Sequence, residues 1–273
     1  MAKKVSKIDY SEAMLPRTRK AQFGDCFKMN YMVLLKCGLM LLLFFTPLIA
    51  FSFFMDFYYV PLMDNATGEI EQTKLIYHYI YNGGLILFSL LAIVGITGVI
   101  RVLRNLIWGE GIFFREDFFL GIKQNISKNL IFALIFGVFY ALAYFVSSLF
   151  PDTIIAYLPL LLFALIFLPV YFWIILLNNT YDSKGTSLLR NGLFFYIKTI
   201  GWSLIGTIML VLPVGLLFVP LMLVWVKYIV LVLFVIFVFP IIFLVMVLYS
   251  ISKFDVYINQ DNYPDFFMRG LNY

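Results

Sequence analysis

The chain has 273 residues, of which 63% are apolar and 13% charged; 20 basic and 15 acidic side chains give a net charge of +5 at pH 7. Soluble globular domains are about 45–50% apolar and about 25% charged, so too few charges are present to cover a water-exposed surface of this size. The composition predicts a protein embedded in lipid. It excludes a disordered chain, a disulfide scaffold and a nucleic-acid-binding protein.

The chain begins with a basic segment, residues 1–36, which we expect to lie in the cytoplasm. Arg17, Arg19 and Lys20 within it are expected to contact anionic lipid headgroups, each contributing about 1 kcal/mol before screening. A cleaved signal peptide is the alternative. The apolar run that follows, 37–56, is longer than the roughly 7–15 residues of the apolar core of a signal peptide, and further apolar runs come after it. We therefore expect it to be an uncleaved first span.

Six apolar stretches are long enough to cross a membrane, because a helix needs roughly 20 apolar residues to span about 30 Å of hydrocarbon. The last two are continuous in sequence, and we expect the break between Pro220 and Lys227, near the interfacial aromatic Trp225. The sequence therefore predicts an all-α polytopic membrane protein with a cytoplasmic tail, residues 251–273. The expected spans are about 37–56, 83–100, 129–150, 154–177, 199–219 and 228–250.

The basic residues are distributed unevenly between the two sides that these six spans define. One side receives 18 of the 20 lysines and arginines, and Lys74 and Lys227 are left on the other. Basic residues are retained on the cytoplasmic side of a membrane. Both termini are therefore predicted to be cytoplasmic, and Arg101 and Arg104, between spans two and three, are expected to contact headgroups.

Two connections on the basic side have the apolar spacing of amphipathic helices. Residues 113–128 precede the third span and residues 186–198 precede the fifth. We expect helices lying in the lipid interface. The alternative is that each segment is the cytoplasmic end of one long tilted helix.

The residues that could carry chemistry are few. Cys26 and Cys37 are expected to be free thiols, and with His78 they are too few for a zinc site, so no cofactor or metal is expected. Motifs for phosphate cradles and for the common nucleophilic and metal enzymes are absent from the sequence. No charge is expected well inside a span, which argues against a proton-coupled carrier.

Four uncharged polar residues remain as candidates for contact with a solute or partner. Asn178 and Asn179 are expected at the inner end of span four, where helix capping is the alternative explanation. Tyr77 and Tyr79 are expected on the outer side, in an aromatic belt that could also stack against a sugar.

Three stretches, residues 15–50, 113–137 and 171–201, resemble the YesL-like family of bacterial membrane proteins. The second is the most specific, with an aromatic-rich entry, FFREDFF, and a polar centre, KQN, before a span. The resemblance implies a multi-span protein of the inner membrane, in a family often found near carbohydrate-uptake genes and without an assigned activity. It implies no functional residues.

Together these observations favour a non-enzymatic accessory or assembly partner of another membrane protein or transporter complex, and the resemblance implies a link to carbohydrate uptake. A small facilitator of neutral solutes is the alternative, and a membrane enzyme is third. A facilitator should have polar residues from several spans around a cavity near the middle of the bilayer. An accessory protein should have a dry core.

Overall fold

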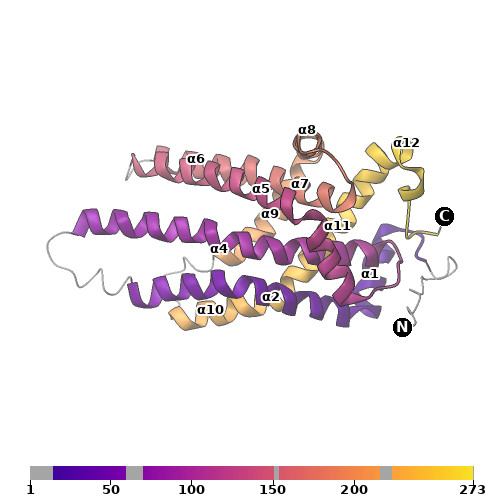
Figure 1. The fold of residues 1–273 in the computed structure, drawn as a ribbon, viewed down its shortest axis with the longest axis horizontal. Helices are drawn as coiled ribbons and strands as arrows, with labels where there is room; N and C mark the ends of the chain where they lie inside the picture. The colour runs from indigo at the N-terminus through magenta and orange to yellow at the C-terminus, as the bar shows by residue number, and fades with distance from the viewer. Residues whose placement is uncertain (1–14, 60–69, 151–153, 216–222, 273) are drawn as a thin grey trace.

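The computed structural model describes residues 15–59, 70–150, 154–215 and 223–272, and these form an elongated bundle of α-helices with no strand among them (Figure 1). This confirms the predicted all-α polytopic fold. The principal helices are α1 (Arg19–Met29), α2 (Tyr31–Phe54), α4 (Ile70–Ile107), α5 (Phe114–Ser148), α6 (Leu158–Leu162), α7 (Leu168–Thr180), α8 (Gly185–Lys198), α9 (Ile200–Gly215), α10 (Val224–Leu233), α11 (Phe239–Phe254) and α12 (Gln260–Asn262).

Five helical runs in the described residues are long and apolar enough to cross a membrane on their own. A sixth crossing is obtained if α8 and α9, which meet at an angle of 101°, count as one broken span. The five runs are Tyr31–Phe57, Tyr79–Ile107, Phe114–Ser148, Leu158–Thr180 and Val224–Asn262.

Three of these runs pass through a proline without breaking: α2 contains Pro47, and each of the other two has a π-helical turn ahead of its proline. A π-helical turn, η4 (Phe163–Phe167), lies just before Pro169, and a second, η6 (Phe234–Val238), lies just before Pro240. Proline has no N–H to donate and its ring clashes with the preceding turn, so the wider π turn accommodates it at the cost of a local bend. Of the residues expected to mark the break between spans five and six, Pro220 lies outside the described residues, and Trp225 and Lys227 belong to α10, which begins at Val224.

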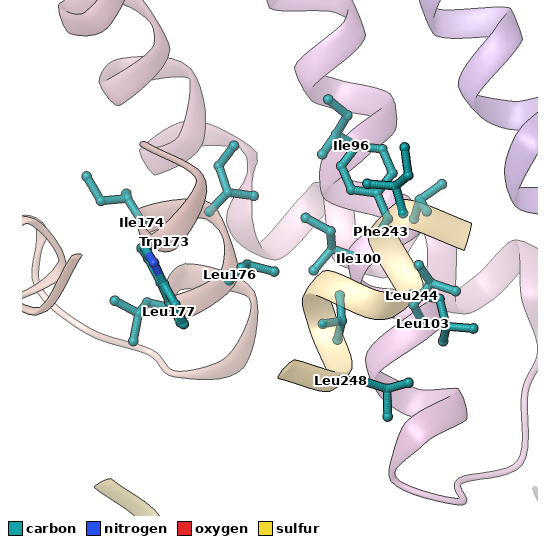
Figure 2. Packing of buried hydrophobic residues seen from close by; sticks show 14 of the residues in the cluster. Ile96, Ile100, Leu103, Trp173, Ile174, Leu176, Leu177, Phe243, Leu244 and Leu248 are labelled. Carbon is teal, nitrogen blue, oxygen red and sulfur yellow. The ribbon is translucent and has the colours of Figure 1, made fainter. Parts of the chain in front are cut away.

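The core lies where α4, α7 and α11 come together, and Figure 2 shows the side chains that these helices contribute. Ile100 and Leu103 of α4 and Leu244 of α11 are almost completely buried. Elsewhere α2 approaches η6 so closely that a Cβ at Gly38 would lie 1.9 Å from the Ile236 carbonyl oxygen, so this contact requires glycine.

The two amphipathic segments have different structures. Residues 113–128 are not a separate interfacial helix: α5 runs unbroken from Phe114 to Ser148, and Phe118 and Gly121 are buried in the bundle rather than facing lipid. The long-helix alternative is correct there, because the apolar stripe packs against α4. Residues 186–198 do form a separate helix, α8, with Leu193 and Ile197 of its predicted apolar stripe exposed.

The first and last described residues lie at the same end of the bundle, which we call the termini end (Figure 1). The backbone N–H of Asn272 donates to the carbonyl oxygen of Pro16 at 3.0 Å. A chain that starts and finishes at one end traverses the bundle an even number of times, which favours counting α9 as the sixth crossing.

Candidate functional site

A polar face on the last turns of α4 begins the candidate site. Arg101, Arg104, Asn105 and Trp108 follow one another at helical spacing, so they share one side of α4. Only 5% of Arg104 is exposed. One of its terminal nitrogens donates to the backbone carbonyl of Asn179, and the other donates to Asn105 Oδ1 at 3.0 Å.

The guanidinium of Arg104 also lies 4.4 Å from the centre of the Trp108 ring, in a cation–π contact. Its partners are therefore two neutral oxygens and an aromatic face, with no carboxylate at ion-pair distance among the described residues. A buried charge without a counter-ion is costly, which makes this arginine unusual in a bundle of this composition.

A chain of buried amides joins α4, α5 and α7 beside this face. Asn178 Nδ2 donates to Asn129 Oδ1 at 2.8 Å, and Asn129 Nδ2 donates to Thr97 Oγ1 at 2.9 Å. Asn125 Nδ2 donates to Asn179 Oδ1 at 3.1 Å, which adds a second link between α5 and α7. Because the amides satisfy one another, they can be buried and fix the register of the three helices.

The C-terminal segment closes the site from the termini end. Arg269 forms an ion pair with Glu110, with 2.9 Å between Nη2 and Oε1, and its guanidinium lies 4.9 Å from the centre of the Trp108 ring. Gly270, next in the chain, has φ of +81°, and a Cβ there would lie 2.0 Å from the Ile107 carbonyl oxygen. Only glycine fits, so the tail can lie directly against the end of α4.

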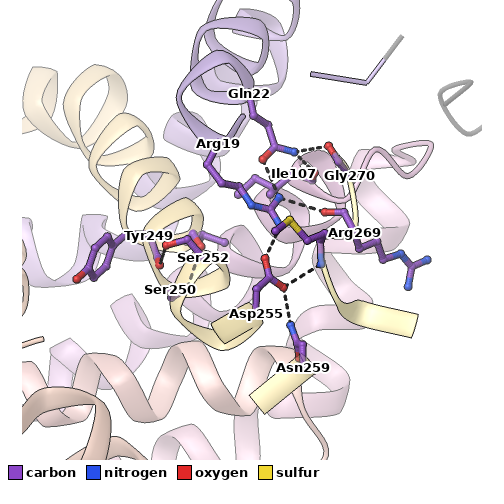
Figure 3. A network of polar contacts seen from close by, with 12 residues as sticks. Arg19, Gln22, Ile107, Tyr249, Ser250, Ser252, Asp255, Asn259, Arg269 and Gly270 are labelled. Carbon is purple, nitrogen blue, oxygen red and sulfur yellow. Dashed lines mark hydrogen bonds and ion pairs between the residues drawn. The ribbon is translucent and has the colours of Figure 1, made fainter. Parts of the chain in front are cut away.

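Asp255, just after α11, anchors that tail (Figure 3). It accepts from Arg19 Nη2 at 2.7 Å, from Asn259 Nδ2 at 2.8 Å and from the backbone N–H of Met268 at 3.2 Å. Arg19 also donates to the carbonyl oxygen of Arg269 at 3.1 Å. The network therefore connects α1, the end of α11 and the tail that carries Arg269.

These elements enclose a cavity of 490 Å³, which we call the arginine pocket. Burial and the nearby charge of Asp255 raise the pKa of the Tyr181 hydroxyl in its wall, and this hydroxyl donates to Asn259 Oδ1. The wall carries three arginines against two carboxylates, so its formal charge is positive. It is formed by Arg101, Arg104, Trp108, Glu110, Gln124, Asn125, Asn178, Asn179, Thr180, Tyr181, Asp182, Phe266 and Arg269.

The structure brings four of the predicted site residues together in this pocket: Arg101, Arg104, Asn178 and Asn179. Asn178 and Asn179 are not merely capping groups, because their side chains bond across helices. Tyr79 lies on the far part of α4, 39% exposed, with its hydroxyl 3.1 Å from Ser148 Oγ. Tyr77 belongs to α4, but its side chain lies outside the described residues.

The predicted headgroup contacts need correction at two positions. Arg104 is buried, and Arg19 is occupied by Asp255, Gln22 and the Arg269 carbonyl, so neither is free to contact lipid. Span two was expected to end at about residue 100, but α4 continues to Ile107, so Arg101 and Arg104 belong to its last turns. Arg17 and Lys20 are exposed, and their headgroup contacts stay a prediction.

Sequence reasoning missed Trp108, Gln124, Asn125 and Arg269. The helical spacing of Arg101, Arg104, Asn105 and Trp108 was a signal that could have found the first of these, had span two been extended beyond residue 100. Nothing in the sequence pointed to Arg269, because its position depends on the fold of the tail.

The two cysteines are free, as predicted, and both are buried. In the part of the chain that the structure describes, no three His, Cys, Asp or Glu side chains are grouped to hold a metal ion. Comparison with models of protein families, with curated proteins and with solved structures found no match.

Proposed function

We propose that this chain is a non-enzymatic accessory or assembly partner of another membrane protein in the bacterial inner membrane, with both termini in the cytoplasm. The orientation is supported by the 18 of 20 basic residues that fall on the side of the termini. The termini end, with the arginine pocket, would then face the cytoplasm.

The observation that carries the proposal is the apolar middle of the bundle. A cavity of 390 Å³ lies there between α2, α4, α5, α7 and α11, and its wall is almost entirely aliphatic and aromatic. Two of its few polar groups are already bonded within the protein: Ser89 Oγ donates to the Ile86 carbonyl at 2.7 Å, and the Tyr171 hydroxyl donates to the Asn129 carbonyl at 3.2 Å.

A sugar passing through this cavity would lose its hydrogen bonds to water without replacing them. Each unreplaced hydroxyl hydrogen bond costs roughly 2–7 kcal/mol, depending on the reference medium. The middle of the bundle is therefore a poor path for a polar solute, which favours the accessory role over the facilitator.

The outer surface of α5 is suited to contact lipid or another membrane protein. Val138 is 60% exposed and Leu142 is 54% exposed, and both are apolar. The proposed link to carbohydrate uptake rests on the YesL-like resemblance alone.

Reconstitution into proteoliposomes with a pH gradient and a panel of neutral sugars tests the proposal, with solute content and lumenal pH followed together. We expect neither sugar nor proton flux above that of empty liposomes. A matched variant, Ala133→Trp, narrows the apolar cavity, since Ala133 lies in its wall. Sugar equilibration that is present in the wild type and abolished by Ala133→Trp would overturn the accessory role and establish the facilitator.

Co-purification in mild detergent supplies the positive arm of the test. A membrane protein that remains bound through two purification steps, and whose amount falls when Val138→Trp or Leu142→Trp alters the α5 surface, is the expected result. Ile131→Trp alters the same exposed face of α5 about two turns before Val138. Comparing the amount of bound partner in this variant with that in Val138→Trp shows how far along α5 the contact extends. A chain that purifies alone under every mild condition would contradict the proposal.

A further inference from the structure

We propose that the arginine pocket is a binding site for a phosphate-type dianion carried on a small organic group. The inference goes beyond the accessory role and does not depend on it, because it rests on the charges, donors and walls of one cavity.

The charges of the pocket are not balanced by the protein. Three arginines and two carboxylates line it, and both carboxylates already have a cation. Glu110 pairs with Arg269 at 2.9 Å, and Asp182 pairs with Lys128 at 2.9 Å. Arg101 and Arg104 therefore have no carboxylate at ion-pair distance among the described residues, and Glu110 and Asp117 act on them only through longer-range electrostatic attraction.

Asp117, a third acidic residue nearby in sequence, does not line the pocket. It is buried at the start of α5 and accepts the backbone N–H of Phe113 at 2.9 Å. Its carboxylate thus reaches back to the N-cap residue of that helix, as the acidic member of a capping box does.

Unused donors accompany the unpaired charge. Arg101 makes no hydrogen bond with any described residue, and Arg104 uses two of the five N–H groups that a guanidinium carries. Trp108 Nε1, also buried, has no partner in the described part of the chain. Two guanidiniums with free N–H groups fit the oxygens of a phosphate, which accept several charge-assisted hydrogen bonds at once.

The remaining walls favour an organic group attached to the anion. Trp108, Tyr181 and Phe266 supply aromatic surface, and the side chains of Gln124 and Asn125 supply amides. A volume of 490 Å³ falls within the roughly 300–1,000 Å³ of small-molecule sites. Bare phosphate would leave most of this space unfilled.

Two sources could present this chemistry: a soluble phosphate monoester and the phosphate of a membrane lipid. The pocket lies at the end of α4, a helix of 38 residues that is about 57 Å long, against about 30 Å of hydrocarbon. The end of α4 can therefore extend beyond the hydrocarbon, where both a soluble phosphate monoester and a lipid headgroup can reach the pocket. The experiment below separates these two sources.

Binding is measured on the full chain purified in detergent, by calorimetry and by thermal unfolding, with inorganic phosphate, phenyl phosphate and chloride at matched ionic strength. We expect saturable binding of phosphate and none of chloride. Phenyl phosphate should bind about 2- to 10-fold more tightly than phosphate because of the aromatic walls. For the lipid source, the chain is placed in nanodiscs of phosphatidylcholine with and without phosphatidic acid.

Arg101→Gln is the principal variant, because Arg101 is half-buried and bonds to no described residue, so its loss leaves no partner unsatisfied. It should weaken phosphate binding about 10- to 100-fold, because the charge-assisted hydrogen bonds from Arg101 to the phosphate are lost. The phosphate affinity of Arg101→Lys should lie between those of the wild type and Arg101→Gln, since lysine keeps the positive charge but lacks the paired N–H groups of the guanidinium. Arg190→Gln on α8, exposed and outside the pocket, is the matched control and should bind as the wild type does.

Circular dichroism and size-exclusion chromatography show that each variant is folded. Phosphate-monoester binding that Arg101→Gln weakens and Arg190→Gln leaves unchanged supports the site with a soluble ligand. A response to phosphatidic acid alone, again lost in Arg101→Gln, supports the site with a lipid ligand. Absence of both responses, binding unchanged in Arg101→Gln, or an equal effect of chloride overturns the proposal.

Discussion

The termini end and the middle of the bundle hold cavities of similar order, 490 and 390 Å³, but their walls are opposite in character. The arginine pocket is lined by three arginines, four side-chain amides and two carboxylates. The middle cavity is lined by aliphatic and aromatic side chains. A sequence with so few charges thus places most of its buried charged and amide side chains at the termini end, with Asn82 as an exception.

The two regions are also held together differently. The middle depends on packing, with contacts such as that of Gly38 against η6. The termini end depends on hydrogen bonds and ion pairs among segments far apart in sequence, for example Arg19 with Asp255. Such networks are costly when incomplete, so the termini end should be far more sensitive to the loss of a single polar atom.

The largest effect is expected from Asp255→Asn. It leaves the partly buried Arg19 guanidinium without its carboxylate, and because Arg19 keeps some exposure to solvent, the cost should lie toward the lower end of the about 3–5 kcal/mol typical of breaking a buried ion pair. Thermal unfolding in detergent, followed by circular dichroism, measures the loss. Asp182→Asn is the control: it removes the ion pair with Lys128, in which the Asp182 side chain is fully exposed, and should leave the unfolding temperature unchanged. Equal unfolding temperatures of the two variants would show that the Asp255 network stabilises the protein no more than the exposed ion pair of Asp182 does.

The next effect is expected from Gly270→Ala. The left-handed backbone and the close approach to the Ile107 carbonyl should cost about 1–3 kcal/mol and displace the tail that carries Arg269. Gly24→Ala in α1 is the matched control, since nothing lies within 4 Å of the added Cβ. That substitution should stabilise the protein by about 0.5–1 kcal/mol, because glycine is unfavourable inside a helix. A Gly270→Ala variant as stable as the wild type would show that the tail is free to move away.

Asn129→Leu tests the amide chain between the two regions. Asn129 is completely buried, and its loss removes one hydrogen bond each from Asn178 and Thr97, which keep their bonds to the carbonyl oxygens of Asn125 and Ile93. Interhelical hydrogen bonds in membrane proteins average about 0.6 kcal/mol and reach about 1.7 kcal/mol, so a decrease in this range is expected. Unfolding of Asn129→Leu, Asn178→Leu and the double variant measures the coupling. Additive effects would show that the two amides act independently.

The sequence was sufficient to predict the helical class, because long apolar stretches permit only helices in lipid. It also placed Asn178 and Asn179 correctly as a polar helix end. It placed Arg104 wrongly, since a charge near a span end is normally exposed, and only the contacts from Asn105, Trp108 and Asn179 show how this one is buried. The contribution of Arg269 comes from the folded tail, which hydropathy does not describe.

The smallest effect concerns Cys26, an apolar group at the otherwise polar termini end. Only 4% of it is exposed, and burial together with the charge of Asp25 raises the pKa of its thiol to about 12. In the unfolded chain the pKa is about 8.5. Below that value the thiol is protonated in both states, so the folded state loses nothing. Above it the unfolded chain releases a proton that the folded protein retains, and stability falls as pH rises toward the folded pKa.

Between pH 8 and pH 9.5 this loss amounts to about 1 kcal/mol. Lysines and tyrosines titrate nearby, so the measurement compares the wild type with Cys26→Ala by thermal unfolding at both pH values. The variant removes only the contribution of Cys26 to the pH dependence. Between pH 8 and pH 9.5, the free energy of unfolding should therefore fall by about 1 kcal/mol less in Cys26→Ala than in the wild type. Identical pH dependence of the two proteins would mean that Cys26 ionises as readily when folded as when unfolded, and α1 would then not be packed against the bundle as tightly as its burial indicates.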